Sequence, residues 1–156
     1  MKQLFTTLVT ILIFSFASYA QSGAGLDNEK GTSMKPIIDP LKVDVESLEK
    51  ENLEIVHIEY DLLFDKDTKE VYRDLSDSYT YAIMAYGDYR IAKVGLDLYK
   101  ESGTTWEFVK SGEFADGLCS LIYKVETSGS YKIVIRPLQM TEGYTVGHYG
   151  LYVMHE

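Results

Sequence analysis

Asp97 is the residue whose surroundings first raise a question of chemistry. It lies inside the otherwise apolar run 94–99 (VGLDLY), just before the turn signal Ser102-Gly103. A carboxylate there can serve as a ligand or a catalytic group, or it can be the solvent-facing member of an alternating strand. Alternation places Asp97 with Gly95 and Tyr99 on one face, and the aliphatic residues of the run on the other. We therefore interpret Asp97 as structural or weakly metal-linked, and not as catalytic.

Calcium is the one metal for which the sequence offers candidate ligands, because Ca²⁺ takes several oxygen ligands that converge from loops. The candidates are Asp88 and Asp97, which lie near predicted turns. The segment 65–70 (DKDTKE) begins like an EF-hand loop, but it lacks the central glycine and carries lysines in place of ligands or neutral spacers. A solvated turn explains this segment better than a metal site. We expect no other cofactor.

Hydrolytic motifs such as G-x-S-x-G and H-E-x-x-H do not occur in the sequence. The three histidines are His57, His148 and His155, and none pairs with another at the spacing of zinc ligands. Cys119 is the only cysteine, and its apolar neighbours are typical of a buried structural thiol. No pair of carboxylates can be singled out among 24 acidic residues. We predict no catalytic residue, and we expect that the protein is not an enzyme.

Aromatic residues are the remaining candidates for recognition. Tyrosine combines a flat apolar ring with a polar hydroxyl, so it serves both in cores and on binding surfaces. Stacking on sugar rings or gripping a peptide would use aromatic side chains at strand ends or beside turns. The candidates by that criterion are Tyr86, Tyr89, Tyr99, Trp106 and Tyr144. The alternative is that these residues fill the core or cap its ends.

The elements that position all of these residues are predicted to be strands. Apolar and polar residues alternate repeatedly from residue 79 to residue 155. Turn signals separate the strands at Gly87-Asp88, Ser102-Gly103, Asp116-Gly117 and Ser128-Gly129. The segment 79–86 is apolar on both faces, which predicts a central strand. No helical segment is long enough for a βαβ crossover. The pattern predicts an all-β fold, an antiparallel β-sandwich of the jelly-roll type.

Residues 45–58 fit either a helix or a strand. The stretch SLEKENLE is rich in helix formers, whereas alternation from Val56 to Phe64 indicates a strand. We favour a hairpin that turns at residues 65–69 and returns through VYRDL. One or two helical turns near residues 45–51 would precede it.

Residues 1–20 have the layout of a cleaved secretory signal peptide, with cationic Lys2, an apolar core and small residues before the cleavage site. We expect a mature protein that begins at Gln21, lies in the periplasm or outside the cell, and is not inserted in a membrane. Residues 21–44 are rich in glycine and proline and predict a flexible leader, followed by a single domain over 45–156. The net charge of −9 argues against nucleic acid as a partner.

Four motifs occur in a characteristic order between residues 75 and 156: LSDSYTYAIMAYGD, VGLDLYKESG, TSGSYKIVIRP and GHYGLYVMHE. This order resembles that of bacterial pre-peptidase C-terminal domains and related small jelly-roll sandwiches. The resemblance covers about half of the chain. It implies an accessory module of the kind attached to secreted hydrolases, with a role in binding or secretion and no catalysis of its own. Gly95 stands where the DLDL strand of that family has its first aspartate. Asp97 therefore lacks the second carboxylate of the strand, and the resemblance does not extend to calcium binding.

These observations predict an exported, non-catalytic binding or accessory module that contacts a protein or a glycan. Two alternatives stay open from the sequence. One is a small exported hydrolase that uses carboxylate or histidine chemistry. The other is a self-assembling protein with a structural role in the envelope.

Overall fold

The computed structural model describes residues 34, 35, 37, 38, 45, 53–115 and 117–156. The predicted signal peptide, most of the predicted leader and most of segment 45–51 lie outside these residues. Within the described part of the chain, no helix is long and apolar enough to cross a membrane.

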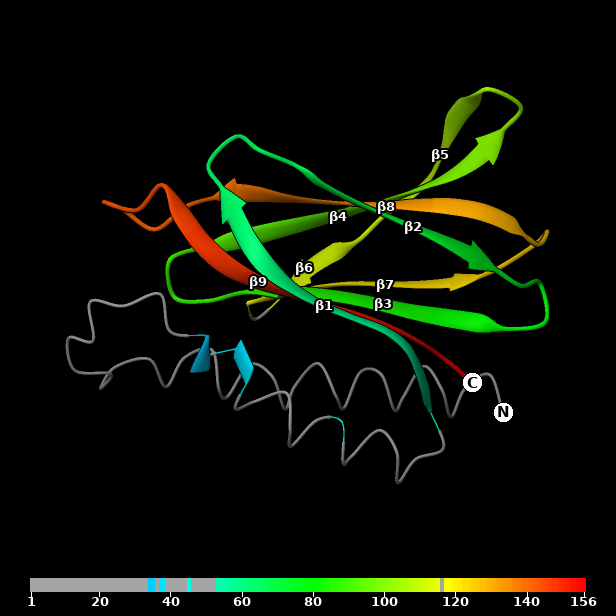
Figure 1. The fold of residues 1–156 in the computed structure, drawn as a ribbon, viewed down its shortest axis with the longest axis horizontal. Helices are drawn as coiled ribbons and strands as arrows, with labels where there is room; N and C mark the ends of the chain where they lie inside the picture. The colour runs from blue at the N-terminus through cyan, green and yellow to red at the C-terminus, as the bar shows by residue number, and fades with distance from the viewer. Residues whose placement is uncertain (1–33, 36, 39–44, 46–52, 116) are drawn as a thin grey trace.

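Two antiparallel sheets form the fold (Figure 1). The five-stranded sheet has the order β1-β9-β3-β7-β6, and the four-stranded sheet has the order β2-β8-β4-β5. The strands are β1 (Glu54–Phe64), β2 (Lys69–Leu75), β3 (Thr80–Gly87), β4 (Lys93–Ser102), β5 (Thr105–Ser111), β6 (Glu113–Ala115), β7 (Leu118–Lys124), β8 (Gly129–Gln139) and β9 (Val146–His155).

The strand pairs are nested. β1 pairs with β9, β2 with β8, β3 with β7 and β4 with β5, so the chain folds like one long hairpin that is rolled up on itself. This nesting is the topology of a jelly roll, with the short β6 added at the edge beside β7. The predicted fold class is confirmed.

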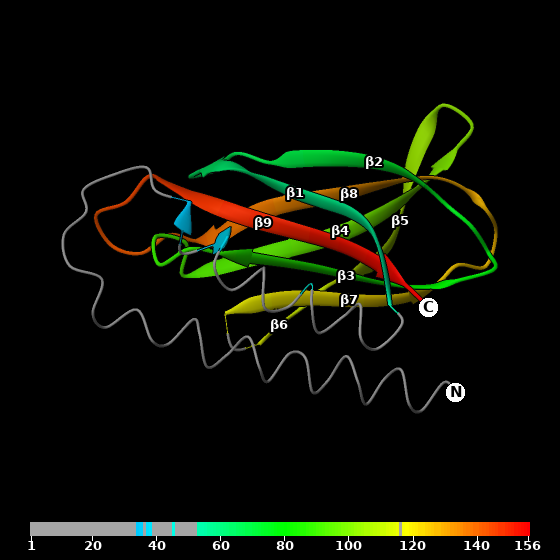
Figure 2. The same ribbon diagram turned by 60° about the horizontal axis from the view of Figure 1, so that its bottom comes forward.

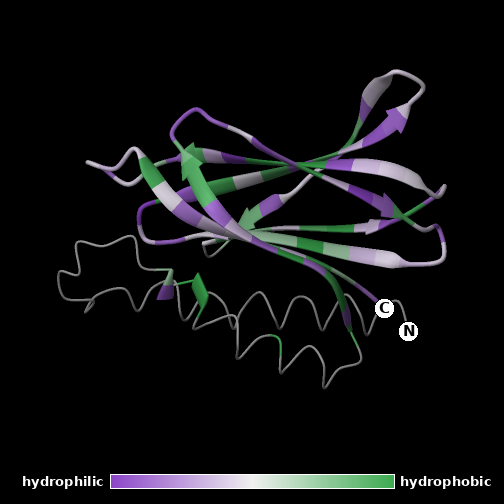
Figure 3. Cartoon of the chain, viewed as in Figure 1, coloured by the Kyte–Doolittle hydropathy of each residue, from purple (hydrophilic) through white to green (hydrophobic). Residues whose placement is uncertain are grey.

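The main core lies between the two sheets and is built from alternate residues of the strands. Val94, Leu96 and Leu98 point into it from β4, as alternation predicts. The same period of two gives the bands of hydrophobic and hydrophilic residues that run across the strands (Figure 3). Burial of these side chains is the main source of stability, because the chain has a single thiol and therefore no internal disulfide.

A second apolar cluster covers the outer face of the five-stranded sheet. β3 contributes Ala82, Met84 and Tyr86 to it, and β9 contributes Tyr152 and Met154. The side chain of Ile37, from the segment before β1, is completely buried in this cluster. β3 is therefore apolar on both faces, and it lies between β9 and β7 as the central strand that the sequence predicts.

The predicted hairpin over residues 56–75 is wrong, although both of its strands exist. β1 pairs with β9 and β2 pairs with β8, so the two strands belong to different sheets. Leu63 and Val71 both point into the main core, one from each sheet. The chain therefore crosses from one sheet to the other through the turn at residues 65–68. Alternation fixes which face of a strand is buried, but it does not fix the strand's partner.

Candidate functional site

Four aromatic side chains lie on the outer face of the four-stranded sheet, and we call them the aromatic platform: Tyr72 on β2, Tyr99 on β4, and Trp106 and Phe108 on β5. The strand register explains the grouping. Tyr72 lies opposite Lys132 of β8, Lys132 lies opposite Tyr99, and Tyr99 lies opposite Phe108. Residues that are directly opposite share a face, so Tyr72, Lys132, Tyr99 and Phe108 form one row across the sheet. Trp106 is two residues before Phe108 on β5 and lies beside this row, opposite Glu101.

The platform rings pack against one another while staying open to solvent. The ring centroids of Tyr72 and Trp106 are 5.4 Å apart, and those of Tyr99 and Phe108 are 5.7 Å apart in an edge-to-face arrangement. Tyr72 is 53% exposed and Phe108 is 59% exposed. A contiguous group of exposed aromatic rings is a candidate interaction surface, whereas a single exposed ring is ordinary.

Lys132 lies within the platform and is held by a carboxylate. Its Nζ is 5.3 Å from the ring centroids of both Tyr99 and Trp106, and 3.0 Å from Oε1 of Glu70. The Tyr72 hydroxyl donates a hydrogen bond to the other oxygen of Glu70. This bond, and then Lys132, lowers the pKa of Glu70, and the carboxylate raises the pKa of Tyr72. The ring of Tyr72 is thereby anchored to the centre of the row.

Asp97 lies beside the platform on the same outer face. Its carboxylate accepts a hydrogen bond from the Ser111 hydroxyl at 2.6 Å and forms an ion pair with Arg136. The bonds tie β5 and β8 to the strand between them, and they leave Asp97 buried. These contacts suit a structural role.

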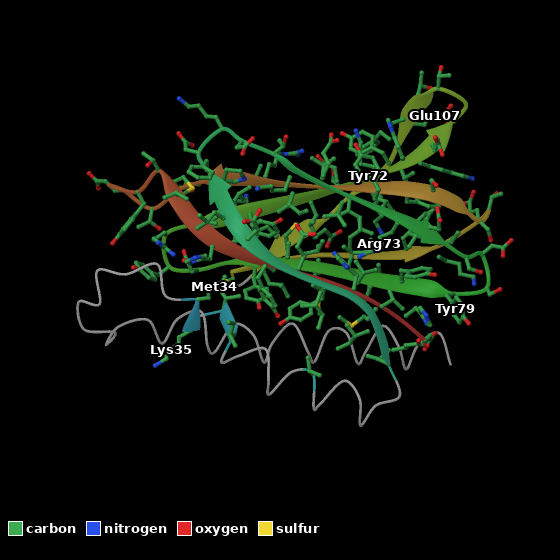
Figure 4. The ribbon with its side chains drawn as sticks, viewed as in Figure 1. Met34, Lys35, Tyr72, Arg73, Tyr79 and Glu107 are labelled. Carbon is green, nitrogen blue, oxygen red and sulfur yellow. The ribbon has the colours of Figure 1, made fainter. Side chains whose placement is uncertain are left out.

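The β4–β5 hairpin projects from the body of the sandwich (Figures 1 and 2). Figure 4 shows Glu107 near its tip and Tyr72 on the same side of the molecule, whereas Met34 and Lys35 lie on the side of the five-stranded sheet. The register shift between Leu98 and Tyr99 marks the position of a bulge, a feature that bends a strand. Trp106 comes from this projecting hairpin and reaches Tyr72 on the opposite edge strand.

Tyr89 and Tyr144 form a separate aromatic pair at one end of the sandwich. Their ring centroids are 5.7 Å apart, and both rings are exposed. They come from the β3–β4 turn and the β8–β9 loop, which are joined by a hydrogen bond from the Thr141 hydroxyl to the Tyr89 carbonyl. The five sequence candidates are thus divided: Tyr99 and Trp106 belong to the platform, and this pair does not.

Tyr86, the fifth candidate, is buried in the cluster on the outer face of the five-stranded sheet. Its hydroxyl donates to the carbonyl of Ile37 at 3.2 Å and lies 3.0 Å from the hydroxyl of Tyr152. Its ring is stacked on that of Tyr152. Tyr86 therefore contributes to packing in this structure.

Asp88 lies in a buried polar cluster beneath the exposed pair. It forms an ion pair with Arg90, and its carboxylate accepts a hydrogen bond from the backbone N–H of His148 at 3.0 Å. The pairing with Asp88 raises the pKa of Arg90. Asp88 and Asp97 thus belong to different networks, each with its own arginine. No group of three or more His, Cys, Asp or Glu side chains among the described residues is arranged to hold a metal ion.

A third polar cluster lies where β1 and β2 meet, and the sequence did not single it out. His57 Nε2 is 3.3 Å from Oε2 of Glu59, its Nδ1 contacts Arg73, and the Tyr149 hydroxyl donates to the other oxygen of Glu59. Burial, and then the charge of Arg73, lowers the pKa of His57. The sequence signal was the alternation of β1, in which these polar residues take the face that Leu63 buries.

Two platform residues, Tyr72 and Phe108, were also missed. Tyr72 alternates with the buried Val71 and Leu75, so the period of two already places it on an outer face. Phe108 is the neighbour of Val109, which packs against the core, so the same period places Phe108 on the outer face. Neither residue lies beside a turn, so the criterion of strand ends and turns does not include them.

No protein-family model matches the sequence, and no curated protein sequence matches it. Solved structures do match. The pre-peptidase C-terminal domain of a collagenase from Bacillus anthracis superposes with a TM-score of 0.50 at 17% sequence identity, covering 62% of this chain and 87% of that domain. The fold resembles that of a pre-peptidase C-terminal domain. The resemblance indicated by the sequence motifs is thereby confirmed for the fold.

Two further solved structures match with lower TM-scores. One is PliG from Aeromonas hydrophila, a periplasmic inhibitor of g-type lysozyme, with 12% identity, 68% of this chain and 90% of that chain covered, and a TM-score of 0.49. The other is the mitogen derived from Yersinia pseudotuberculosis, with 14% identity, coverage of 67% and 86%, and a TM-score of 0.46. Identities this low concern the fold alone.

Proposed function

We propose that this protein is an exported, non-catalytic binding module whose partner contacts the aromatic platform. The observation that carries the proposal is the row from Tyr72 to Phe108, which leaves two large rings more than half exposed on an open sheet face. Exposed aromatic clusters of this kind mark interaction sites. The resemblance in fold to an accessory domain supports the same class of function.

Export rests on the sequence of residues 1–20, which has the cationic start, apolar core and small-residue cleavage site of a signal peptide. The protein would then act in the periplasm or outside the cell.

A hydrolase is supported less well than a binding module. A reacting group must reach its substrate, but the side chains of His148 and Asp97 are each 5% exposed. Each is also engaged with an arginine, Arg90 and Arg136 respectively. The contacts of Asp97 join β4 to β5 and β8, and the contacts of His148 join β9 to the β3–β4 turn. Each set of contacts therefore has a structural explanation.

The proposal is tested by capturing partners from envelope extract and culture fluid on the immobilised exported protein. We expect a partner that the wild-type protein retains and the Tyr72→Ala/Phe108→Ala variant loses. The matched control is Tyr89→Ala/Tyr144→Ala, which removes the other exposed aromatic pair and should retain the partner. Loss of capture in the control alone, or no capture above background by the wild-type protein, would contradict the proposal.

A further inference from the structure

We infer that the aromatic platform binds a neutral glycan chain, an inference that rests on the proposed binding function. Aromatic rings on this face are interleaved with ion pairs, and the combination suits sugars. A pyranose ring has C–H groups that carry slight positive charge on its faces, and it has hydroxyl groups around its rim. The C–H groups pack on the negative face of an aromatic ring, while the hydroxyls need both donors and acceptors nearby.

The arrangement of the rings fits an extended ligand. Tyr72 lies on one edge strand of the four-stranded sheet and Phe108 lies on the opposite edge strand. Neighbouring strands are about 4.8 Å apart, so the row extends over roughly 14 Å. A chain that crosses the four strands would meet both exposed rings, with Tyr99 and Lys132 between them.

The ion pairs supply the polar contacts. Lys132 is 3.0 Å from Glu70, and the side chain of Glu70 is 42% exposed. Arg136 pairs with Asp97, and the side chain of Arg136 is 39% exposed. Each pair therefore presents one charged group to solvent: the carboxylate of Glu70 as an acceptor and the guanidinium of Arg136 as a donor. A sugar hydroxyl can use either, because it both donates and accepts.

The charges favour a neutral glycan over other partners. Lys132 in the row and Arg136 beside it are already paired with the carboxylates of Glu70 and Asp97. Because the whole chain carries a net charge of −9, an anionic polymer would be repelled. The centre of a protein–protein interface is typically depleted of charge. Here the ammonium group of Lys132, paired with Glu70, lies within the platform beside the rings of Tyr99 and Trp106, which fits hydroxyl groups better than an apolar protein patch.

Affinity electrophoresis of the full exported protein tests this inference. The gels contain soluble β-glucan, galactomannan or arabinoxylan as neutral probes, and polygalacturonate as the anionic probe. We expect at least one neutral probe to retard the protein equally at about 50 mM and about 500 mM NaCl, since no counterion is released. Tyr72→Ala and Phe108→Ala should each weaken that binding at least about tenfold.

Tyr144→Ala is the matched control and should bind like the wild-type protein, and circular dichroism checks that every variant is folded. Retardation by polygalacturonate alone, or by none of the probes, overturns the inference. If capture from extract instead yields a protein that depends on Tyr72 and Phe108, the glycan is wrong while the binding face stands. If no capture depends on these residues, the proposed function fails as well.

Discussion

At the scale of single residues, the surroundings of a side chain decide its chemistry more than its type does. Asp97 carries a carboxylate that would suit a metal site, yet Arg136 and Ser111 occupy its two oxygens. His57 is held between Arg73 and Glu59. Both residues give predictions that follow from these partners.

Replacing Asp97 with alanine should destabilise the protein by about 1.5–3 kcal/mol, since it removes charged hydrogen bonds from Ser111 and Arg136. The effect stays below that of a fully buried ion pair, because Arg136 is partly exposed and can reach water. Urea unfolding monitored by circular dichroism measures the change. Glu107→Gln, at an exposed position of β5, is the control and should change stability by no more than about 0.5 kcal/mol. Equal effects of the two substitutions would show that the Asp97 network contributes nothing.

Protonation of His57 should cost stability at mildly acidic pH. Its pKa in the folded protein lies below the ordinary value of about 6.5, so the unfolded chain binds the proton more readily. Above pH 6.5, His57 is neutral in both states and does not reduce the free energy of unfolding. That free energy falls as the pH drops below 6.5, because the unfolded chain takes up a proton at His57 more readily than the folded protein.

The test of this histidine compares the free energy of unfolding at about pH 7.5 and about pH 5.5. The wild-type protein should lose more stability between these two values than His57→Gln, which has no ionisable group at this position. A larger loss in the variant would contradict the assigned direction of the pKa shift.

At the scale of the elements, β9 lies between β1 and β3 in the five-stranded sheet and contributes to both apolar clusters. Tyr149, Leu151 and Val153 point into the main core, and Tyr152 and Met154 pack on the outer face. Gly150 lies under the ring of Tyr86, where a Cβ atom would come within 2.6 Å of ring carbon. Such a strand tolerates little change on either face.

Gly150→Ala should therefore destabilise the protein by about 1–3 kcal/mol, because the ring of Tyr86 must move out of a packed cluster. Gly95→Ala is the matched strand substitution. Its Cβ would meet the side chain of Leu138 at 3.0 Å, but that side chain is 47% exposed and can rotate away. The cost of Gly95→Ala should stay within about 1 kcal/mol. Thermal and urea unfolding compare the two, and a larger cost at Gly95 would contradict this packing argument.

At the scale of the whole molecule, stability depends on the core between the sheets, and Cys119 reports on it. The thiol is buried in that core, and burial raises its pKa. Reactivity requires the thiolate, so the folded protein should be protected.

We expect thiol labelling with a disulfide reagent to be slow in buffer and complete in denaturing urea. The labelling rate should rise together with the unfolding transition seen by circular dichroism. The urea-unfolded protein is the control for full reactivity. Fast labelling in buffer would mean that the region around β7 opens without global unfolding.

Much of this fold could be predicted from the sequence, because a strand with one buried face shows an alternation of apolar and polar residues along the chain. That period placed Val94, Leu96 and Leu98 inward and Asp97 outward, and it made β3 a central strand with two apolar faces. The same period indicated the all-β class, and the Gly, Asp and Ser turn signals indicated where strands end. The motif order was sufficient for the resemblance in fold that the solved structures bear out.

Only the tertiary structure decided which strands pair, and the site follows from the pairing. Tyr72 and Phe108 are distant in sequence, and they share one row because β8 and β4 lie between their strands. The same long-range pairing replaced the expected hairpin by a crossing between sheets, and it brought His57 against Arg73. Alternation is a local property, whereas a strand's partner depends on the packing of the whole chain, so the sequence determined the faces and the fold determined the platform.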